Sequence, residues 1–422
     1  MLVASLVFNA LCFSPGMAQV DSTSAPSMSF KGAQGWDLNL GGRYSLATTE
    51  LAHIGGWAQY VVSERGRQVQ GISGIAAAQR VAPVLTVSSE RFSDPLPLQA
   101  LWRDDLARAV PRGDHNLIYL RDEVRLGARW SSGVLSAVAR QSATLVANGG
   151  AVSVIQDVSS PGPPAQSYDR PVKLRMSGFV GAGLAFDTSG LLPGGQWSWQ
   201  SGVQVLSLRR FIARDLRGRA AFDEASGIYA LQAQSGQADD RLKFPFQQSF
   251  DSSGWGLLFN GGLSWQASEQ ARLSLSIEDL GRLQWSGLPQ DDMNVSTNTS
   301  QVDQDGYLVY RPLVSGRYSQ TRYTTKSVAT WRAGAEWQWA PAWLAVVQVR
   351  RMDGFEPWLP YTGAQWASGN WRVSAGWLWH ERALSLAAAN GPWQLTLAAD
   401  RLDASAHART VSLGWVGAWD AH

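Results

Sequence analysis

The chain has 422 residues, and its 36 Lys and Arg nearly balance its 34 Asp and Glu. A hydrophobic content of 45% excludes a disordered polyampholyte, and a net charge of +2 leaves no basic surplus for a nucleic-acid partner. Downstream of the N-terminus, no apolar run approaches the ~20 residues that a membrane-spanning helix needs. Together with 21 Trp and 42 Gly, this composition fits either a large soluble β-protein or a membrane β-barrel.

Residues 1–18 are uncharged and predict a secretory signal peptide. An apolar core from Leu2 to Phe13 is followed by a small-x-small sequence at residues 16–18. No basic leader precedes the core, so the true start codon is left open, and a short buried segment is the alternative. Leu11 stands where a lipidated Cys12 would need a small residue, which argues against lipidation. Cleavage would remove the single Cys, so the exported protein would not depend on disulfides.

The next residues are harder to assign. Residues 19–80 are expected to form an N-terminal segment, which is either a lid inside a lumen or a source of first strands. Leu96–Val110 places apolar side chains along one stripe and predicts a helix in an external loop.

Residues 81–419 are predicted to form a transmembrane antiparallel β-barrel. Val81–Glu90 gives one strand, four more follow between His115 and Leu208, and nine follow from Trp255 onward, which makes 14. Two further strands within the N-terminal segment would raise the count to 16, and this alternative stays open.

The position of tryptophan favours a barrel over a soluble sandwich. In Thr330–Trp339 and Trp371–His380, apolar and polar residues alternate with period two, as in half-buried strands. The apolar face of each strand carries Trp near both ends, and Trp255 and Trp265 repeat this pattern upstream. Indole rings prefer the headgroup region of a bilayer, so barrels carry aromatic girdles at both strand ends. A sandwich core gives no reason for this placement.

Loop lengths give a second argument for the barrel. Short connections such as Asn390-Gly391-Pro392 alternate with long ones, namely Leu145–Pro171, Arg209–Ser253 and Ser286–Lys326. Outer-membrane barrels have short periplasmic turns and longer external loops. All long connections then fall outside the cell, and the short His380–Arg382 connection is the weak member of that set.

The polar face of the strands would line the lumen. Mixed signs on this face argue against a strongly ion-selective pore. The side chains are expected either to pair across neighbouring strands as a wall-stabilising ladder or to form a polar path for solute. The predicted lumen-lining residues are Glu123, Arg125, Arg129, Lys173, Arg175, Glu278, Arg332, Glu336, Arg350, Arg372 and Asp400, with Gln348 among them.

One motif stands out on the predicted strands. In Leu273–Trp285 (LSLSIEDLGRLQW), Asp279 breaks the alternation and Gly281 would permit a bend or bulge. Asp279, Leu280, Gly281 and Trp285 therefore mark either a structural end of the strand or an element of a gate.

This stretch resembles a motif of FadL-like outer-membrane proteins, in particular the DUF5723 group and relatives such as PorV. In those proteins a strand ends on Asp-Leu-Gly and a long external loop follows. The Asn-Pro-Ala segment that many FadL-like proteins carry near their start is absent, so the resemblance does not extend to their plug. The resemblance implies a Gram-negative outer-membrane channel that passes a small hydrophobic or amphipathic molecule. PorV-like relatives imply the alternative, a scaffold that docks a secretion-system or surface protein.

The sequence nominates no catalytic residues, cofactor site or metal site. Its five His lack metal-ligand spacing, and no nucleophile elbow occurs. The acidic pairs in the predicted loops are expected to be solvated or to bridge surface lipids through divalent cations. We therefore expect a protein that is not an enzyme, whose partners are the lipid bilayer, surface lipids and a hydrophobic small molecule or docked protein.

Overall fold

The computed structural model describes the chain from Ala82 to Val416 with gaps. The described residues are 82–94, 98, 116–130, 133–159, 166–193, 195–242, 253–298, 300–302, 308–310, 312–354, 357–403 and 405–416. The predicted signal peptide, the N-terminal segment 19–80 and the predicted helix Leu96–Val110 lie outside these residues, apart from Leu98.

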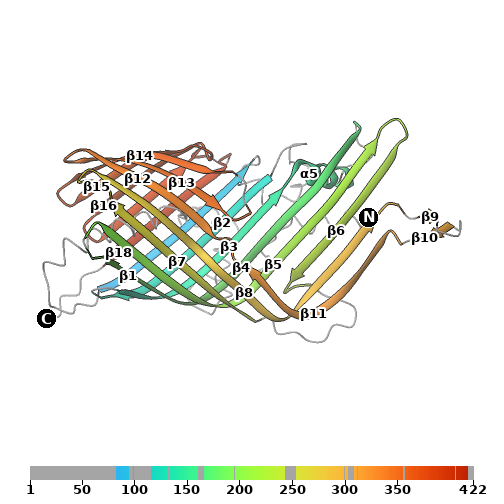
Figure 1. The fold of residues 1–422 in the computed structure, drawn as a ribbon, viewed down its shortest axis with the longest axis horizontal. Coiled ribbons are helices and arrows are strands. Elements are labelled where there is room, and N and C mark those ends of the chain that lie inside the picture. The colour runs from blue at the N-terminus through green and yellow to red at the C-terminus, as the bar shows by residue number, and fades with distance from the viewer. Residues whose placement is uncertain are drawn as a thin grey trace, which may run out of the picture.

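Fourteen strands form a closed antiparallel barrel (Figure 1). In ring order they are β8 (Ala271–Ser296), β12 (Thr330–Ala340), β13 (Trp343–Met352), β14 (Leu359–Ser368), β15 (Trp371–Leu378), β16 (Ala383–Asn390), β17 (Trp393–Ala399), β18 (Ala408–Val416), β1 (Ala82–Asp94), β2 (Asn116–Arg129), β3 (Gly133–Ala147), β4 (Tyr168–Leu191), β5 (Trp197–Asp223) and β7 (Gly254–Gln266). The ring closes because β8 pairs with both β7 and β12. The predicted count of 14 and the chain segments assigned to the strands are confirmed.

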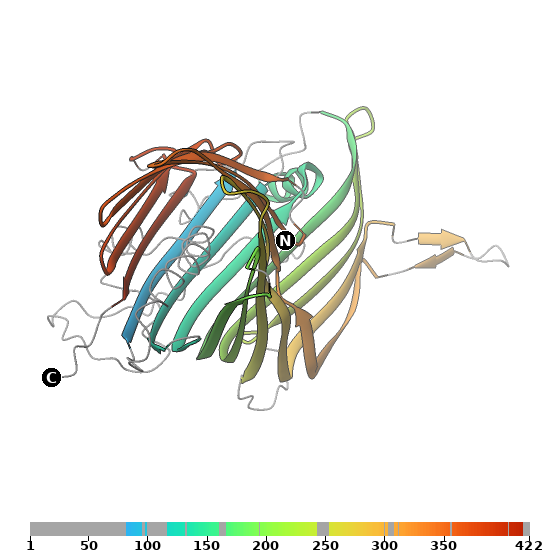
Figure 2. The ribbon, with the colours of Figure 1, turned by 60° about the vertical axis from the view of Figure 1, so that its left-hand side comes forward.

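The predicted long loops Arg209–Ser253 and Ser286–Lys326 are wrong over much of their length, because β5 and β8 continue for 27 and 26 residues. Beyond the ring they pair with β6 (Ile228–Asp239) and β11 (Val314–Lys326), and β6 also pairs with β8. We call β6, β11, the parts of β5 and β8 that pair with them, and the far half of β4 the extension. The short hairpin of β9 (Ser300–Val302) and β10 (Leu308–Tyr310) projects beyond it (Figure 2).

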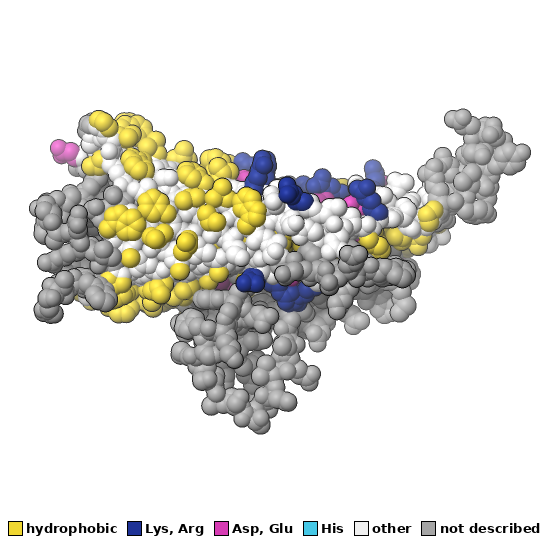
Figure 3. Space-filling model, turned by 90° about the horizontal axis from the view of Figure 1, so that it is seen from below, with side chains coloured by type: hydrophobic (Ala, Val, Ile, Leu, Met, Phe, Trp, Pro, Cys, Tyr) yellow, Lys and Arg dark blue, Asp and Glu magenta, His cyan; other side chains and the backbone are white. Residues whose placement is uncertain are grey.

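The outer wall of the ring carries a belt of exposed apolar side chains, which Figure 3 shows in yellow. Trp331 and Trp339 are 43% and 59% exposed, and Trp371 and Trp379 are 50% and 55% exposed. Leu and Phe side chains fill the belt between such pairs, for example Leu257 and Phe259 on β7. The aromatic girdles predicted from the sequence therefore face outward, as contact with lipid requires.

Beyond the belt, α5 (Gly149–Ser159) covers the outer face of the extension, in a segment predicted to be a loop. Leu145 on β3 and Leu174 on β4 follow the same faces of their strands as the exposed Leu135 and Leu184, and both are buried against this helix. Asn148 caps the helix by accepting a hydrogen bond from the backbone N–H of Ala151 at 3.0 Å. No helix among the described residues is long and apolar enough to cross a membrane.

Bulges change which face of β5 and β8 points inward. The β4–β5 register shifts at Gly181, opposite Leu208, so that Arg209 is an extra residue on β5. Even-numbered residues of β5, such as Leu208, face inward before this point, and odd-numbered ones, such as Phe211, do so after it. A strict period of two across these segments therefore misassigns one half of each strand.

Candidate functional site

A network of buried ion pairs lies inside the ring. Arg140 on β3 donates two hydrogen bonds of 2.5 Å to the carboxylate of Asp279 on β8. Arg121 on β2 reaches Glu278 at 2.8 Å and Asp279 at 3.3 Å. Arg332 on β12 also binds Glu278. All of these side chains are less than a tenth exposed, so the pairs form in a low-dielectric surrounding where attraction is strong.

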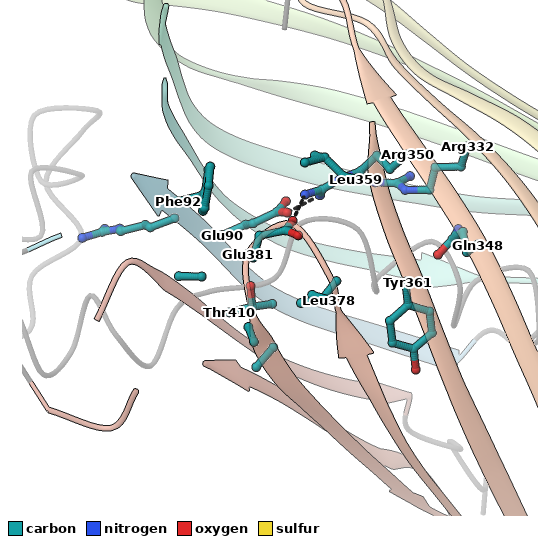
Figure 4. Close-up of a pocket in the computed structure, with 14 residues that line it drawn as sticks. Glu90, Phe92, Arg332, Gln348, Arg350, Leu359, Tyr361, Leu378, Glu381 and Thr410 are labelled. Atoms are coloured by element: carbon teal, nitrogen blue, oxygen red, sulfur yellow. Dashed lines mark hydrogen bonds and ion pairs between the residues drawn. The ribbon is translucent and has the colours of Figure 1, made fainter. Parts of the chain in front are cut away.

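A second part of the network centres on Arg350 of β13. Its guanidinium binds Glu90 of β1 and reaches Oε1 of Glu381 at 3.0 Å, and Tyr119 donates to Glu90 at 2.9 Å. Figure 4 shows the two carboxylates converging on this guanidinium. Glu381 lies in the β15–β16 connection, the one that was too short to match the other external loops. This short connection carries a side chain that reaches into the ring.

The ion pairs cross the lumen and do not merely join neighbours in the wall. Between Arg140 and Asp279 the wall contains β4, β5 and β7, and between Glu90 and Arg350 the shorter path along it contains five strands. Some pairs do join neighbouring strands, as in the predicted ladder: Arg332 of β12 binds Glu278 of β8, and Arg140 of β3 is 3.6 Å from Glu123 of β2. Arg125 binds Glu123 on its own strand and Asp187 two strands away. The described network brings together Arg121, Arg125, Arg140, Arg332 and Arg350 with Glu90, Glu123, Asp187, Glu278, Asp279 and Glu381.

A bulge in β8 places two adjacent acids of this network on the same side. The register with β7 shifts so that Glu278 and Asp279 both lie opposite Asn260, and Asp279 has a φ of 61°. Asn260 accepts a hydrogen bond from the backbone N–H of Asp279 at 2.9 Å. Close to the bulge, a Cβ on Gly281 would stand 1.9 Å from the backbone oxygen of Leu257. The predicted bulge is confirmed, but the strand does not end at this motif and continues to Ser296.

A small cavity of about 30 Å³ lies beside Arg350. Its walls combine Phe92, Leu359 and Leu378 with the polar side chains of Gln348 and Glu381 (Figure 4). Oε2 of Glu381 has no hydrogen-bond partner although it is buried. The cavity can therefore accept a hydrogen bond from a water-sized group such as a hydroxyl.

An apolar patch covers the inner face between the network and the extension. We call it the inner apolar patch, and Phe211 and Trp285 lie at its centre with ring centroids 4.0 Å apart. Its buried members are Val138, Phe179, Ala185, Leu206, Leu208, Phe211, Ala238, Leu258, Leu283, Trp285 and Leu288. The expectation of a polar inner face is therefore wrong for this part of the barrel.

Among the described residues, the strand pairing of the wall is interrupted beside the inner apolar patch. On β5, pairing with β7 ends at Leu208 and pairing with β6 begins at Ile212. On β8, the corresponding limits are Trp285 and Gln290. β6 ends at Asp239 and β7 begins at Gly254, so the two strands follow one another at the level of Phe211 and Trp285 without a shared pairing partner there.

The predicted lumen-lining residues fall into three groups. Glu123, Arg125, Glu278, Arg332 and Arg350 belong to the network, and Gln348 lines the cavity. Nearer the end of the barrel with the short turns lie Arg129, Arg372 and the buried Glu336, which is 3.9 Å from Arg272.

The third group lies toward the opposite end. Lys173 and Arg175 are exposed on the inner face of the extension. Asp400 accepts hydrogen bonds from the backbone N–H groups of His407 and Ala408 and so orders the β17–β18 connection. These three residues are not brought into the network.

Of the motif residues, Asp279 alone joins the ion pairs. Leu280 points to the outer face and is 47% exposed, whereas Trp285 is buried in the inner apolar patch.

Sequence reasoning missed Glu90, Arg121, Arg140, Asp187 and Glu381. A signal was present for Arg121, which continues the alternation of Glu123 and Arg125 by one step. Glu381 lies in a connection, outside any alternating pattern, and offered no such signal.

A search with protein-family models finds no match, and a search of curated proteins finds none. Similar solved structures include CymD, titled a monoaromatic hydrocarbon channel, at 11% identity and a TM-score of 0.38, covering 87% of this chain and 94% of that one. The toluene transporter TodX of P. putida matches at 9% identity and a TM-score of 0.36, covering 83% and 92%. A TodX deltaS2S3 mutant gives 9% and 0.39, covering 82% and 92%. The fold assignment rests on the strand register, and the DUF5723/PorV-type subgroup stays a prediction.

Proposed function

We propose that the chain spans the outer membrane of a Gram-negative bacterium and admits a small hydrophobic or amphipathic molecule. The inner apolar patch carries this proposal. A water-filled pore for polar solutes has no use for buried Phe and Trp side chains on its inner wall. With the extension outside the cell, this patch lies where a hydrophobic molecule would enter the barrel.

The network of ion pairs also supports passage of a hydrophobic molecule, because it opposes the passage of polar ones. Ion pairs that cross the lumen oppose free flow of ions and sugars, because a solute would have to separate buried charges. The interruption of the wall beside Phe211 and Trp285 offers a route that does not pass through these charges. A hydrophobic molecule would then move from the patch into the bilayer.

The cavity beside Arg350 suits the polar end of an amphipathic molecule. Glu381 supplies an acceptor atom, while Phe92 and Leu359 supply apolar contacts. At about 30 Å³ the cavity would take the hydroxyl group of an alcohol or phenol but not its hydrocarbon part.

Reconstitution of the full chain in liposomes tests the proposal. Uptake of toluene or phenol should exceed that of protein-free liposomes, whereas swelling in a small sugar should not. Leu208→Glu places a charge in the patch and should slow uptake, and Arg219→Gln, at an exposed ion pair of the extension, should leave it unchanged. Equal uptake with and without protein would refute the proposed function.

A scaffold that docks a secretion-system or surface protein is the second candidate. The hairpin β9–β10, which projects beyond the barrel (Figure 2), favours it. Replacing residues 299–311 by a short linker distinguishes the two functions. A channel should keep its uptake rate, whereas a scaffold should lose its complex while the barrel stays folded.

A further inference from the structure

Two cations lie directly opposite each other on the outer face of the wall. Arg282 of β8 pairs in register with Lys326 of β11. Both side chains are exposed, and Arg282 alternates with Leu280, which is 47% exposed on the same outer face. Like charges at directly opposed positions of an antiparallel pair destabilise it. Among the described residues, no carboxylate forms an ion pair with either cation.

This pair lies at the edge of the apolar belt. On its other side Arg282 is opposite Leu257, which is 45% exposed. One step further toward the extension, Trp255 is 47% exposed. Trp side chains collect at the headgroup level of a bilayer, so the two cations occupy that level too. Figure 3 shows Lys and Arg side chains gathered just beyond the yellow belt.

Further hydrogen-bond donors continue the row away from the belt. Thr324 and Arg322 follow Lys326 at alternate positions of β11, and all three side chains are exposed. Alternate residues of one strand face the same side and stand ~7 Å apart. Arg322 also lies beside the bulge of β8 at Gly287, which has a φ of 67°. A guanidinium, a hydroxyl and an ammonium group thus extend from the girdle toward the extension.

We propose that Arg282 and Lys326 bind a phosphate group of a lipid in the outer leaflet, with Arg322, ~14 Å further along β11, placed to contact a second phosphate of the same lipid. A phosphate would offset the repulsion between Arg282 and Lys326, and its oxygens match the donors of both side chains. The acyl chains of the same lipid would lie along Leu257 and Leu280. Juxtamembrane Lys and Arg are attracted to anionic lipid surfaces in the same way. The site does not depend on transport through the barrel.

Native mass spectrometry of the full chain in detergent tests this site. The probes are lipid A with two phosphates, the same lipid with its phosphates removed, and inorganic phosphate alone. The variant R282Q/K326Q should retain the phosphorylated lipid about tenfold or more weakly than the unmodified chain. R317Q is the matched control, because Arg317 lies further along β11 and is 3.7 Å from Asp292.

The outcomes separate the possible sources of phosphate. Retention of phosphorylated lipid that the double variant loses, with no retention of the dephosphorylated form, supports the proposal. Equal retention by the double variant, or equal retention of the dephosphorylated lipid, overturns it. Displacement of the lipid by about 10 mM inorganic phosphate would assign the site to the free anion and not to a lipid. Heat-modifiable migration on gels shows that each variant is folded.

Discussion

Arg140 and Asp279 bind each other through two hydrogen bonds of 2.5 Å, although three strands separate them along the wall. The contact joins β3 to the bulge of β8 across the lumen. A substitution that breaks this contact therefore acts at a position that faces no lipid.

Asp279→Asn should lower the free energy of unfolding by about 3–5 kcal/mol, because buried Arg140 loses the carboxylate that it binds most closely and keeps only Glu123 at 3.6 Å. Asn keeps the shape of the side chain and tolerates a positive φ, so the loss reports on the ion pair. Urea unfolding of the detergent-solubilised barrel measures it. Asp169→Asn, at an exposed pair with Arg219, serves as the control and should give no measurable change. A loss of less than about 1 kcal/mol for Asp279→Asn would contradict a stabilising role of the cross-lumen pair.

Arg350→Met should raise ion conductance in planar bilayers. The substitution removes the cation between Glu90 and Glu381, so the two carboxylates repel each other and the contact across the lumen is lost. The extra current should be cation-selective, because negative charge is left uncompensated. Unchanged conductance would mean that these pairs do not restrict the lumen. Arg351→Met, on the outer face against Trp358, is the matched control.

Gly376→Ala should destabilise the barrel by about 1–3 kcal/mol through overpacking. An added Cβ would lie 2.1 Å from the hydroxyl oxygen of Tyr361, whose ring fits against the wall only because Gly376 and Gly363 lack side chains. Tyr361→Ala should relieve the clash, so the double variant should lose less than the two single losses added together. Gly236→Ala, whose nearest neighbour is 3.6 Å away, controls for the general effect of Gly to Ala in a strand.

Stability should depend on pH through Asp291 in the extension. Burial, and then the charge of Asp292, raise the pKa of Asp291 to about 6, and its Oδ1 has no hydrogen-bond partner. A carboxyl with a raised pKa in the folded state binds protons more tightly there than in the unfolded chain. Stability should therefore fall as the pH rises from about 4 to above 6.

Asp291→Asn removes this titration. The difference in stability between the variant and the unmodified chain should favour the variant more at pH 7.5 than at pH 4.5. Thermal unfolding at both pH values measures this difference. Asp292→Asn removes only the second of the two causes, so it should reproduce the smaller part of the gain. A stability difference between Asp291→Asn and the unmodified chain that is the same at both pH values would contradict the expectation.

The sequence was sufficient to locate the fourteen strands, because lipid imposes a strict alternation on the outer face and Trp marks both ends of it. It was insufficient for the extension. There, Arg209 and the bulge at Gly287 reverse the facing of β5 and β8, and exposed polar residues such as Arg217 obscure any pattern. β6 and β11 consequently read as loops.

The candidate site was predicted only in part, for a related reason. Alternation shows that Glu278 and Arg332 face inward, but it contains no information about which strands face each other across a closed ring. The pairing of Arg140 with Asp279 depends on the curvature of the barrel, and that of Arg350 with Glu381 depends on the path of a short turn. Neither follows from periodicity.

The extra residue Arg209 also sets how β5 can change length in evolution or by engineering. Removing it would restore strict alternation from Leu208 through Arg210 to Phe211 and would leave Phe211 facing inward. Removing a residue beyond Arg209 would instead turn the side chains that follow it to the other face. Beyond Arg209, insertions or deletions of two residues would preserve the facing of the extension, whereas changes of one would invert it. Loop grafts and tags inserted into β5 between Leu208 and Asp223 should therefore add an even number of residues, which leaves the extension intact.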